Sequence, residues 1–379
     1  MLIGADAVVT GSEVLRPGWL EVVDGRVTRV AGGPPPRPVD VPLGAATVVP
    51  GFVDTHVHGG GGGAFPDATA ESTLRAVGLH ARHGTTAMLA SLVAASPEVL
   101  VRQVAALTEQ VQDGLVAGLH LEGPWLAPGR RGAHEPSALR APDPDELERV
   151  LAAGRGTIRM VTLAPELDGA LDAVRRIVAA GAVAALGHTD ATYDRTRAAI
   201  EAGASVATHL FNAMRPVHHR EPGPVVALLE DSRVTVELIG DGVHLHPALA
   251  RQVWARVGTD RVNLVTDAMA AAGMPDGAYV LGARPVEVAG GVARVAGTET
   301  IAGSTATMDQ LFRFALAHSD PDPDAALRAA VRATSVAPAR ALGLGDRRLA
   351  AGAPADLVAL DLSWAVTAVM RQGEWLRAG

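Results

Sequence analysis

Eight apolar runs recur along the chain, with room for a helix between most of them. The intervening stretches, such as residues 97–114 and 190–204, are rich in alanine, leucine and arginine, and their spacing favours amphipathic helices. Regular alternation of strand and helix predicts a parallel sheet, and eight such units predict an α/β fold of the (β/α)8, TIM-like barrel type. The predicted strands lie at residues 47–58, 85–91, 115–123, 157–166, 182–190, 205–214, 234–244 and 262–269.

Two histidines end the first of these runs. His56 and His58 stand two residues apart in the sequence GFVDTHVHGG. Because side chains alternate along a strand with a period of two, both imidazoles are expected on one face. A pair of neutral imidazoles is a typical partial ligand set for a divalent metal ion.

Four further candidate ligands end later runs. Glu122, His188, His209 and Asp267 each come at the end of a separate predicted strand. A single half-buried histidine is more often a hydrogen-bonded scaffold residue than a ligand. Taken together with the histidine pair, however, these residues fall at the carboxyl ends of strands, where barrel enzymes keep their active sites. The pattern therefore predicts one metal site built from distant parts of the chain.

The predicted site suits hydrolysis. A bound metal ion lowers the pKa of water toward about 7 and polarises a carbonyl group. Asp267 is expected to accept the proton of the attacking water and return it to a leaving amine, with a role as metal ligand or helix N-cap as the alternative. His134, in the loop sequence RGAHEP, is placed to stabilise an oxyanion. The chain contains no cysteine and no lysine, which excludes thiol nucleophiles, Schiff bases and a bridging carbamylated lysine.

The two ends of the chain differ in character from the middle. Residues 1–50 consist of short alternating runs with an Asp24-Gly25 turn, and residues 346–379 share this pattern. We expect the two ends to form one small β-sandwich domain, and residues 51–345 to form the catalytic barrel with a β-hairpin insertion near 278–300. The glycine run 59–63 is interpreted as a place where backbone passes close to the site, with a linker as the alternative.

Composition limits the partners of this 379-residue chain. The formal net charge of -8 argues against a nucleic-acid partner. No apolar run approaches the length of about 18 residues that a membrane span needs, and no signal-peptide pattern begins the chain. We therefore expect no membrane partner and a cytoplasmic location.

Two loops point to an anionic substrate. The sequence FNAMRPVHHREPG contains Asn212, Arg215 and Arg220, and DGVHLHP contains His244. Arginine donates two parallel hydrogen bonds and stays charged, so arginine with histidine and backbone amides matches a phosphate group. A solvated polar loop is the alternative for any one of these residues.

A series of motifs spanning nearly the whole chain resembles the N-acetylglucosamine-6-phosphate deacetylase family of metal-dependent amidohydrolases: PGFVDTHVHGG, HLEGPWLAP, RGAHEP, GHTDATY, THLFNAM, HHREPG, DGVHLHP, TDAMAAAGMPDG and AGSTATMDQ. The resemblance implies removal of the acetyl group from N-acetyl-D-glucosamine 6-phosphate, giving D-glucosamine 6-phosphate and acetate. It also implies roles for individual residues: Glu122, His188 and His209 as principal metal ligands, Asp267 as catalytic acid and base, His134 on the acetyl carbonyl, Asn212, Ala213, Arg220 and His244 on the sugar phosphate, and Met308 near the acetyl group. A homodimer in which Arg220 reaches the neighbouring active site is implied as well.

Several alternatives stay open at this point. Nitrogen and oxygen ligands accept several divalent ions, so zinc is expected first, with iron or another ion as the alternative. Because some members of the resembled family lack the first histidine pair, retention of His56 and His58 leaves one or two ions per subunit open. Glu135 stands where the family usually has asparagine. Another N-acyl or cyclic amide hydrolase is the alternative enzyme, and a non-catalytic scaffold is the alternative outside enzymes.

Overall fold

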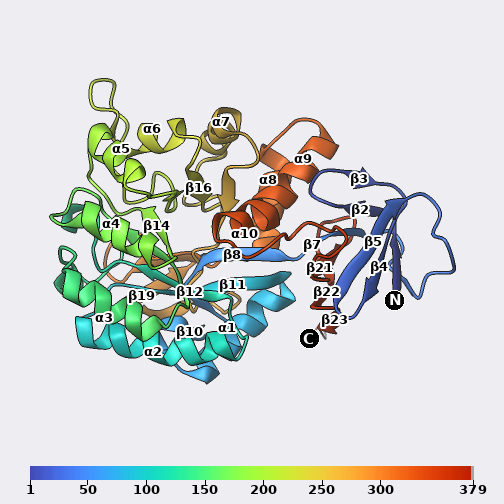
Figure 1. The fold of residues 1–379 in the computed structure, drawn as a ribbon, viewed down its shortest axis with the longest axis horizontal. Helices are drawn as coiled ribbons and strands as arrows, with labels where there is room; N and C mark the ends of the chain where they lie inside the picture. The colour runs from blue at the N-terminus through green and yellow to red at the C-terminus, as the bar shows by residue number, and fades with distance from the viewer. Residues whose placement is uncertain (377–379) are drawn as a thin grey trace.

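The centre of the molecule is a parallel barrel of eight strands, seen in a computed structural model that describes residues 1–376 (Figure 1). Neighbouring strands pair in chain order, and every pairing between them is parallel. The barrel strands are β8 (Phe52–Val57), β11 (Thr85–Leu92), β12 (Gly118–Glu122), β13 (Ile158–Leu163), β14 (Val183–Leu186), β15 (Val206–Ala207), β16 (Thr235–Leu238) and β17 (Val262–Leu264).

Helices surround the barrel and bury their apolar faces against it (Figure 1). Several begin at side-chain caps that satisfy free N–H groups of the first turn, such as Thr69, Asp143 and Thr192. The helices are α1 (Ala70–Arg82), α2 (Pro97–Gln112), α3 (Pro144–Gly154), α4 (Ala170–Ala179), α5 (Tyr193–Glu201), α6 (Gly223–Glu230), α7 (Pro247–Val257), α8 (Met308–His318), α9 (Pro323–Val331) and α10 (Ala337–Ala341), with a π-helical turn at Arg332–Val336.

The last strand meets the first through loop contacts. The N–H of Asp267 donates to the carbonyl of His56 at 2.8 Å, and the N–H of His58 donates to the carbonyl of Ala268 at 2.8 Å. In addition, the Thr266 hydroxyl donates to the buried carboxylate of Asp54 at 2.5 Å. The same contacts that close the barrel therefore hold Asp267 beside the histidine pair.

A β-sandwich built from both chain ends packs beside the barrel (Figure 1). One sheet has the order β5-β4-β1-β6 and the other the order β23-β22-β21-β7-β2-β3. Ile3, Val8, Leu20 and Leu357 belong to the apolar core that the two sheets share. The strands are β1 (Leu2–Ala5), β2 (Ala7–Val9), β3 (Val14–Leu15), β4 (Gly18–Val23), β5 (Arg26–Gly32), β6 (Val41–Pro42), β7 (Thr47–Pro50), β21 (Leu357–Leu360), β22 (Val366–Arg371) and β23 (Glu374–Leu376).

The observed architecture confirms the predicted (β/α)8 barrel with a sandwich from both termini. It also divides the first apolar run, since β7 pairs with β21 of the sandwich while β8 begins the barrel. The exact domain limits of 1–50 plus 346–379 and 51–345 stay predictions, and residues 377–379 lie outside the described residues.

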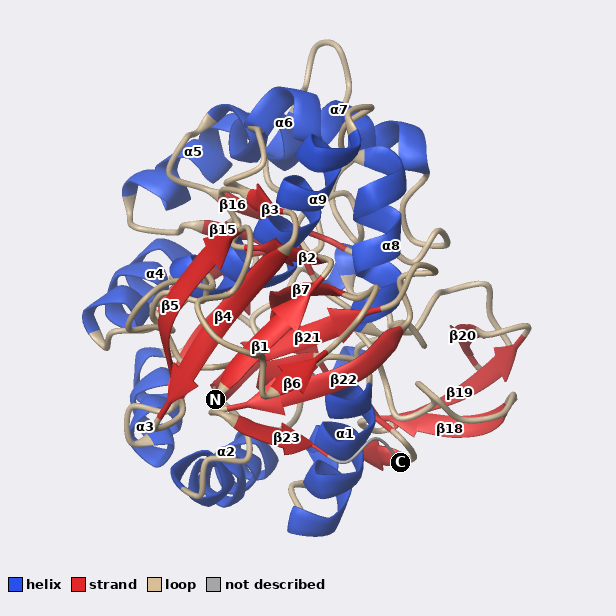
Figure 2. Cartoon of the chain, turned by 90° about the vertical axis from the view of Figure 1, so that its right-hand side faces the viewer, coloured by secondary structure: helices blue, strands red, loops and turns tan. Residues whose placement is uncertain are grey.

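The segment after the eighth barrel strand forms a separate antiparallel sheet at one end of the barrel (Figure 2). It contains β18 (Gly277–Leu281), β19 (Arg284–Ala289) and β20 (Val292–Val295), one strand more than a hairpin. Leu281, Val286 and Val288 pack with Val93 and Met269 of the barrel loops. This packing places the sheet beside the mouth of the barrel.

The glycine run forms the short strands β9 (Gly59–Gly60) and β10 (Gly63–Ala64), which pair directly after the histidines. A Cβ atom on Gly59 or Gly63 would overlap backbone oxygens of Gly63 or Ser72. Close backbone approach, to each other and to α1, explains these two glycines, and the predicted approach of the glycine run to the site stays a prediction. Among residues 1–376, no helix combines the length and apolar character needed to cross a membrane.

Candidate active site

A pocket of about 400 Å³ opens at the carboxyl ends of the barrel strands. This volume lies within the range of sites for small molecules, about 300 to 1,000 Å³. Its floor contains predicted ligands, and its rim includes loops and the three-stranded sheet. The lining residues include His58, Glu122, Arg130, His134, His188, His209, Asn212, Ala213, His244, Asp267, Leu281, Glu299, Thr300 and Ile301.

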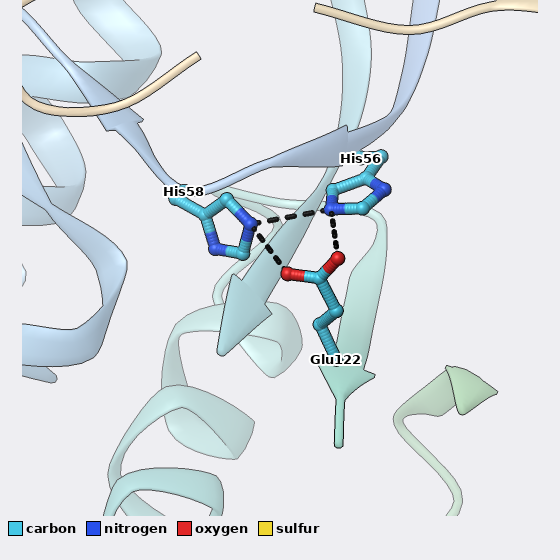
Figure 3. Close-up of side chains that lie close together, drawn as sticks. All are labelled: His56, His58 and Glu122. Atoms are coloured by element: carbon cyan, nitrogen blue, oxygen red, sulfur yellow. Dashed lines mark hydrogen bonds and ion pairs between the residues drawn. The ribbon is translucent and has the colours of Figure 1, made fainter. Parts of the chain in front are cut away.

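The histidine pair of β8 lies against the carboxylate at the end of β12 (Figure 3). His56 Nε2 is 3.2 Å from His58 Nε2 and 3.5 Å from Glu122 Oε1. His58 Nε2 is 3.1 Å from Glu122 Oε2. All three side chains are almost completely buried, so the pair and the carboxylate form one compact cluster, as the period of two predicts for the histidines.

Two more histidines reach the other side of the same carboxylate. Glu122 Oε1 is 3.0 Å from His188 Nε2 and 2.8 Å from His209 Nε2, and these two nitrogens are 3.1 Å apart. Both histidines come shortly after the ends of β14 and β15 and have positive φ angles of 48° and 27°. The left-handed backbone turns each imidazole back over the barrel mouth instead of continuing the strand.

Asp267 completes the cluster from the last strand. Its Oδ1 is 3.2 Å from His58 Nε2 and 3.4 Å from His56 Nε2. Burial alone raises the pKa of this carboxyl, but the charges of His56 and His58 outweigh burial and lower the pKa to about 2. Asp267 is therefore ionised at neutral pH and can accept a proton.

His134 faces the cluster, and its hydrogen bonds show which ring nitrogen carries the hydrogen. Its Nδ1 accepts a hydrogen bond from the N–H of Ala94 at 3.2 Å, so the ring proton is on Nε2. Nε2 is 3.3 Å from Glu122 Oε2. Burial lowers the pKa of His134 to about 4, more strongly than Glu122 raises it. The ring is neutral at pH 7 and presents an N–H group toward the pocket.

The donor atoms of this cluster fit a cation. His58 Nδ1 donates to the carbonyl of Ser91 at 3.2 Å, and His188 Nδ1 donates to the carbonyl of Arg130 at 2.8 Å. Because carbonyls only accept, each Nδ1 carries a hydrogen, and in the neutral form of either ring the lone pair is on the Nε2 that is aimed at the Glu122 carboxylate. Such converging lone pairs favour positive charge among them: burial lowers the pKa of His58, but without a metal ion the nearby carboxylates raise it to about 9 overall, so a proton supplies that charge, and a bound cation would take its place. Two groups have a spacing that could hold a metal ion: His56, His58 and Glu122, and Glu122, His134 and His188. In the second group His134 presents an N–H group and acts as a donor, so Glu122 and His188 are its candidate metal-binding members.

The predicted substrate residues divide into two groups. Asn212, Ala213 and His244 line the pocket, as expected. Arg220 is exposed on the loop before α6, where its guanidinium lies 2.9 Å from His219 Nε2. Met308 is fully buried in the core at the start of α8 and is not among the lining residues. The roles of all five stay predictions.

The surroundings of His244 favour the positively charged form that an anionic ligand needs. Its Nδ1 is 2.7 Å from Asp241 Oδ2. Burial lowers the pKa of His244, but the hydrogen bond and the charge of Asp241 raise it above its usual value overall. An imidazolium at the pocket wall is thereby favoured.

Glu135 turns away from the cluster although it follows His134 directly. Its carboxylate lies 3.5 Å from a guanidinium nitrogen of Arg284 on β19 and accepts from Ser137. Glu135 stands where the resembled family usually has asparagine. Its negative charge is thus paired with an arginine of the three-stranded sheet. The pocket residues Leu281, Glu299 and Thr300 come from the same region and were not among the predicted site residues; only the position of this segment after the last barrel strand could have indicated them.

Comparison with known proteins agrees with this site. The Amidohydrolase family model matches residues 47–376. An N-acetylgalactosamine-6-phosphate deacetylase from Escherichia coli O157:H7 is 38% identical over 94% of this chain and 95% of its own length, and the human N-acetylglucosamine-6-phosphate deacetylase is 39% identical over 98% and 91%.

Solved structures are similar over the full chain. The N-acetyl-D-glucosamine-6-phosphate deacetylase of Mycobacterium smegmatis, solved as a D267A mutant in complex with N-acetyl-D-glucosamine-6-phosphate, is 63% identical with a TM-score of 0.98 and covers 99% of this chain and 98% of its own. The Thermotoga maritima N-acetylglucosamine-6-phosphate deacetylase is 29% identical with a TM-score of 0.89, over 99% of both chains.

The barrel and its histidine–carboxylate cluster define a metal-dependent amide hydrolase of the barrel class. The chain belongs to the amidohydrolase family, and the resemblance of its motifs to the N-acetylglucosamine-6-phosphate deacetylases within that family is confirmed.

Proposed function

We propose that the chain removes the acetyl group from N-acetyl-D-glucosamine 6-phosphate, producing D-glucosamine 6-phosphate and acetate. The observation that carries this proposal is the convergence of His188 and His209 on Glu122, within 3.0 Å, beside the ionised Asp267. The relatives named above are 6-phosphate deacetylases of acetylated amino sugars. A non-catalytic scaffold would have no need of so many converging ligands.

The proposed cofactor is a divalent metal ion held mainly by Glu122, His188 and His209, with zinc first and iron or another ion as the alternative. When bound, such an ion polarises the acetamide carbonyl and lowers the pKa of water toward about 7. The additional nitrogens of His56 and His58 favour room for a second ion in each subunit.

Side chains of the protein would transfer the protons and donate the hydrogen bonds of the reaction. Asp267 would accept the proton of the water that attacks the acetamide carbon and would deliver it to the nitrogen as the carbon–nitrogen bond breaks. His134 would donate its Nε2 hydrogen to the carbonyl oxygen as negative charge develops there. Water supplies its oxygen to acetate and one hydrogen to the amine nitrogen; its second hydrogen leaves as the proton of acetic acid, which the basic amine or the solvent takes up, so the atoms balance.

The 6-phosphate would lie toward His244 and the Asn212-Ala213 turn, which line the same pocket. The protonated His244 and a backbone N–H supply charge-assisted and neutral hydrogen bonds to phosphate oxygens. Arg220 is exposed on the loop before α6, so we propose that it completes the phosphate site of a second subunit in a homodimer. A cytoplasmic location is part of the same proposal.

Arg220→Ala is expected to raise KM for the phosphorylated substrate about 10- to 100-fold with little change in kcat, because a charge-assisted hydrogen bond contributes about 1.5–3 kcal/mol. The measurement is steady-state acetate release. Arg233→Ala is the matched control, since Arg233 is an exposed arginine paired with Asp231 and Glu201 on the barrel exterior. An unchanged KM in the Arg220 variant would favour another N-acyl or cyclic amide hydrolase, which does not need a phosphate contact.

The activity itself is tested by incubating purified protein and zinc with N-acetylglucosamine 6-phosphate and measuring acetate. The galacto epimer belongs in the same assay, because the Escherichia coli O157:H7 relative is an N-acetylgalactosamine-6-phosphate deacetylase. Release from the gluco substrate supports the proposal. Release from the epimer alone would replace it, and release from neither would refute it.

A further inference from the structure

A fully buried carboxylate lies beside the metal cluster without belonging to it. Glu237 on β16 has no solvent exposure. Its Oε1 is 2.9 Å from the Thr55 hydroxyl, and its Oε2 is 3.3 Å from His56 Nδ1. Burying an ionised group at such a position costs free energy unless its partners are well placed. The presence of a carboxylate here therefore suggests a function for its contacts.

The hydrogen bonds around Glu237 have a defined direction. The side-chain amide of Asn263 donates to the Thr55 oxygen at 2.7 Å. The Thr55 hydroxyl is therefore free to donate its own hydrogen to Glu237 Oε1. Both oxygens of an ionised Glu237 then act as acceptors, one from Thr55 and one from His56.

This arrangement fixes the tautomer of His56. Because an ionised Glu237 can only accept, His56 Nδ1 carries a ring hydrogen, and in the neutral ring that binds a metal ion the lone pair is therefore on Nε2. That nitrogen faces His58 Nε2 at 3.2 Å, Glu122 Oε1 at 3.5 Å and Asp267 Oδ1 at 3.4 Å. His58 and His188 make the corresponding Nδ1 bonds to backbone carbonyls, whereas His56 makes its bond to a charged group.

We propose that Glu237 is a positioning residue of the metal centre, which holds His56 in the metal-binding tautomer and increases the basicity of its Nε2. Hydrogen bonds from metal-bound histidines to carboxylates commonly orient the ring and strengthen binding, and their loss typically weakens metal affinity about 10- to 100-fold. The inference rests on the proposed metal site.

The test compares cobalt binding to the full-length wild type and to Glu237→Gln, by competition with a chelator and by the visible absorption of bound cobalt. Glutamine keeps the size of the side chain but removes its charge. We expect about 10- to 100-fold weaker binding and an altered cobalt spectrum. Glu146→Gln is the matched control, because Glu146 is a buried carboxylate that pairs with Arg140 on the barrel exterior, and its cobalt affinity should equal that of the wild type.

The possible results separate this inference from the proposed function. A wild type that binds no cobalt would contradict the proposed metal site. A wild type that binds cobalt, with a Glu237→Gln variant of equal affinity and spectrum, would overturn the role of Glu237 alone. If that variant does not fold, Thr55→Val removes one donor to Glu237 and keeps its charge. A several-fold loss of cobalt affinity would then support the inference, and an unchanged affinity would overturn it.

Discussion

Asp267→Asn is expected to lower kcat by a factor of about 10² to 10⁴, the usual contribution of general acid–base catalysis. Asparagine has almost the same size as aspartate, but it cannot accept the proton of water at neutral pH. The wild-type carboxylate is ionised at neutral pH and has a free oxygen lone pair for this proton, because the charges of His56 and His58 overcome the effect of burial and lower its pKa to about 2. Substrate affinity should change much less than kcat.

Acetate release under single-turnover conditions measures this effect, and calorimetry of substrate binding measures the affinity. Asp309→Asn is a suitable control, since Asp309 is another buried aspartate with a pKa near 2, held by Thr307 and His83 at the start of α8. It should lose stability but keep kcat. A kcat for Asp267→Asn within about threefold of the wild-type value would exclude Asp267 as the proton carrier.

Glu122→Gln should abolish both metal retention and activity. The Glu122 carboxylate contacts five imidazoles, those of His56, His58, His134, His188 and His209, between 2.8 and 3.5 Å. Burial raises its pKa, yet these imidazoles lower the pKa well below the usual value, so Glu122 is an anion in the native protein. Removing that charge removes the attraction that holds a cation among the imidazole rings. A metal ion contributes several kcal/mol to such reactions, so a loss of about 10³-fold or more in kcat/KM is expected.

Metal content by elemental analysis, measured beside kcat/KM, checks this prediction. Glu135→Gln makes the same chemical change one residue from His134, at a carboxylate paired with Arg284 instead of the cluster. That control should retain its metal. Full metal occupancy in the Glu122 variant would show that the ligands have been assigned wrongly.

Much of the fold and of the cluster could be predicted because local sequence patterns indicate them. The period of two places His56 and His58 together, and eight apolar runs with helical intervals indicate a barrel whose strand ends meet at one mouth. His188, His209 and Asp267 were expected at strand ends for the same reason. Their actual positions, just beyond the strands on left-handed backbone, depend on how the turns pack.

Features that depend on contacts between distant segments could not be predicted. The run 47–58 has one apolar pattern, but the pairing of β7 with β21 assigns its first half to the sandwich. In the sequence, Glu237 is a single acidic residue within an apolar strand. Only the three-dimensional structure shows that its carboxylate contacts His56. The pairing of Glu135 with Arg284 is likewise invisible in the sequence, since almost 150 residues separate the two.

Residues from separate strands are proposed to share one metal ion at the mouth of the barrel. Crystals grown with zinc, measured on both sides of the zinc absorption edge, test this claim directly. The account predicts an anomalous peak bonded to Glu122, His188 and His209 at about 2.0–2.2 Å. Well-ordered side chains with no anomalous peak among them, in protein that still releases acetate, would contradict it.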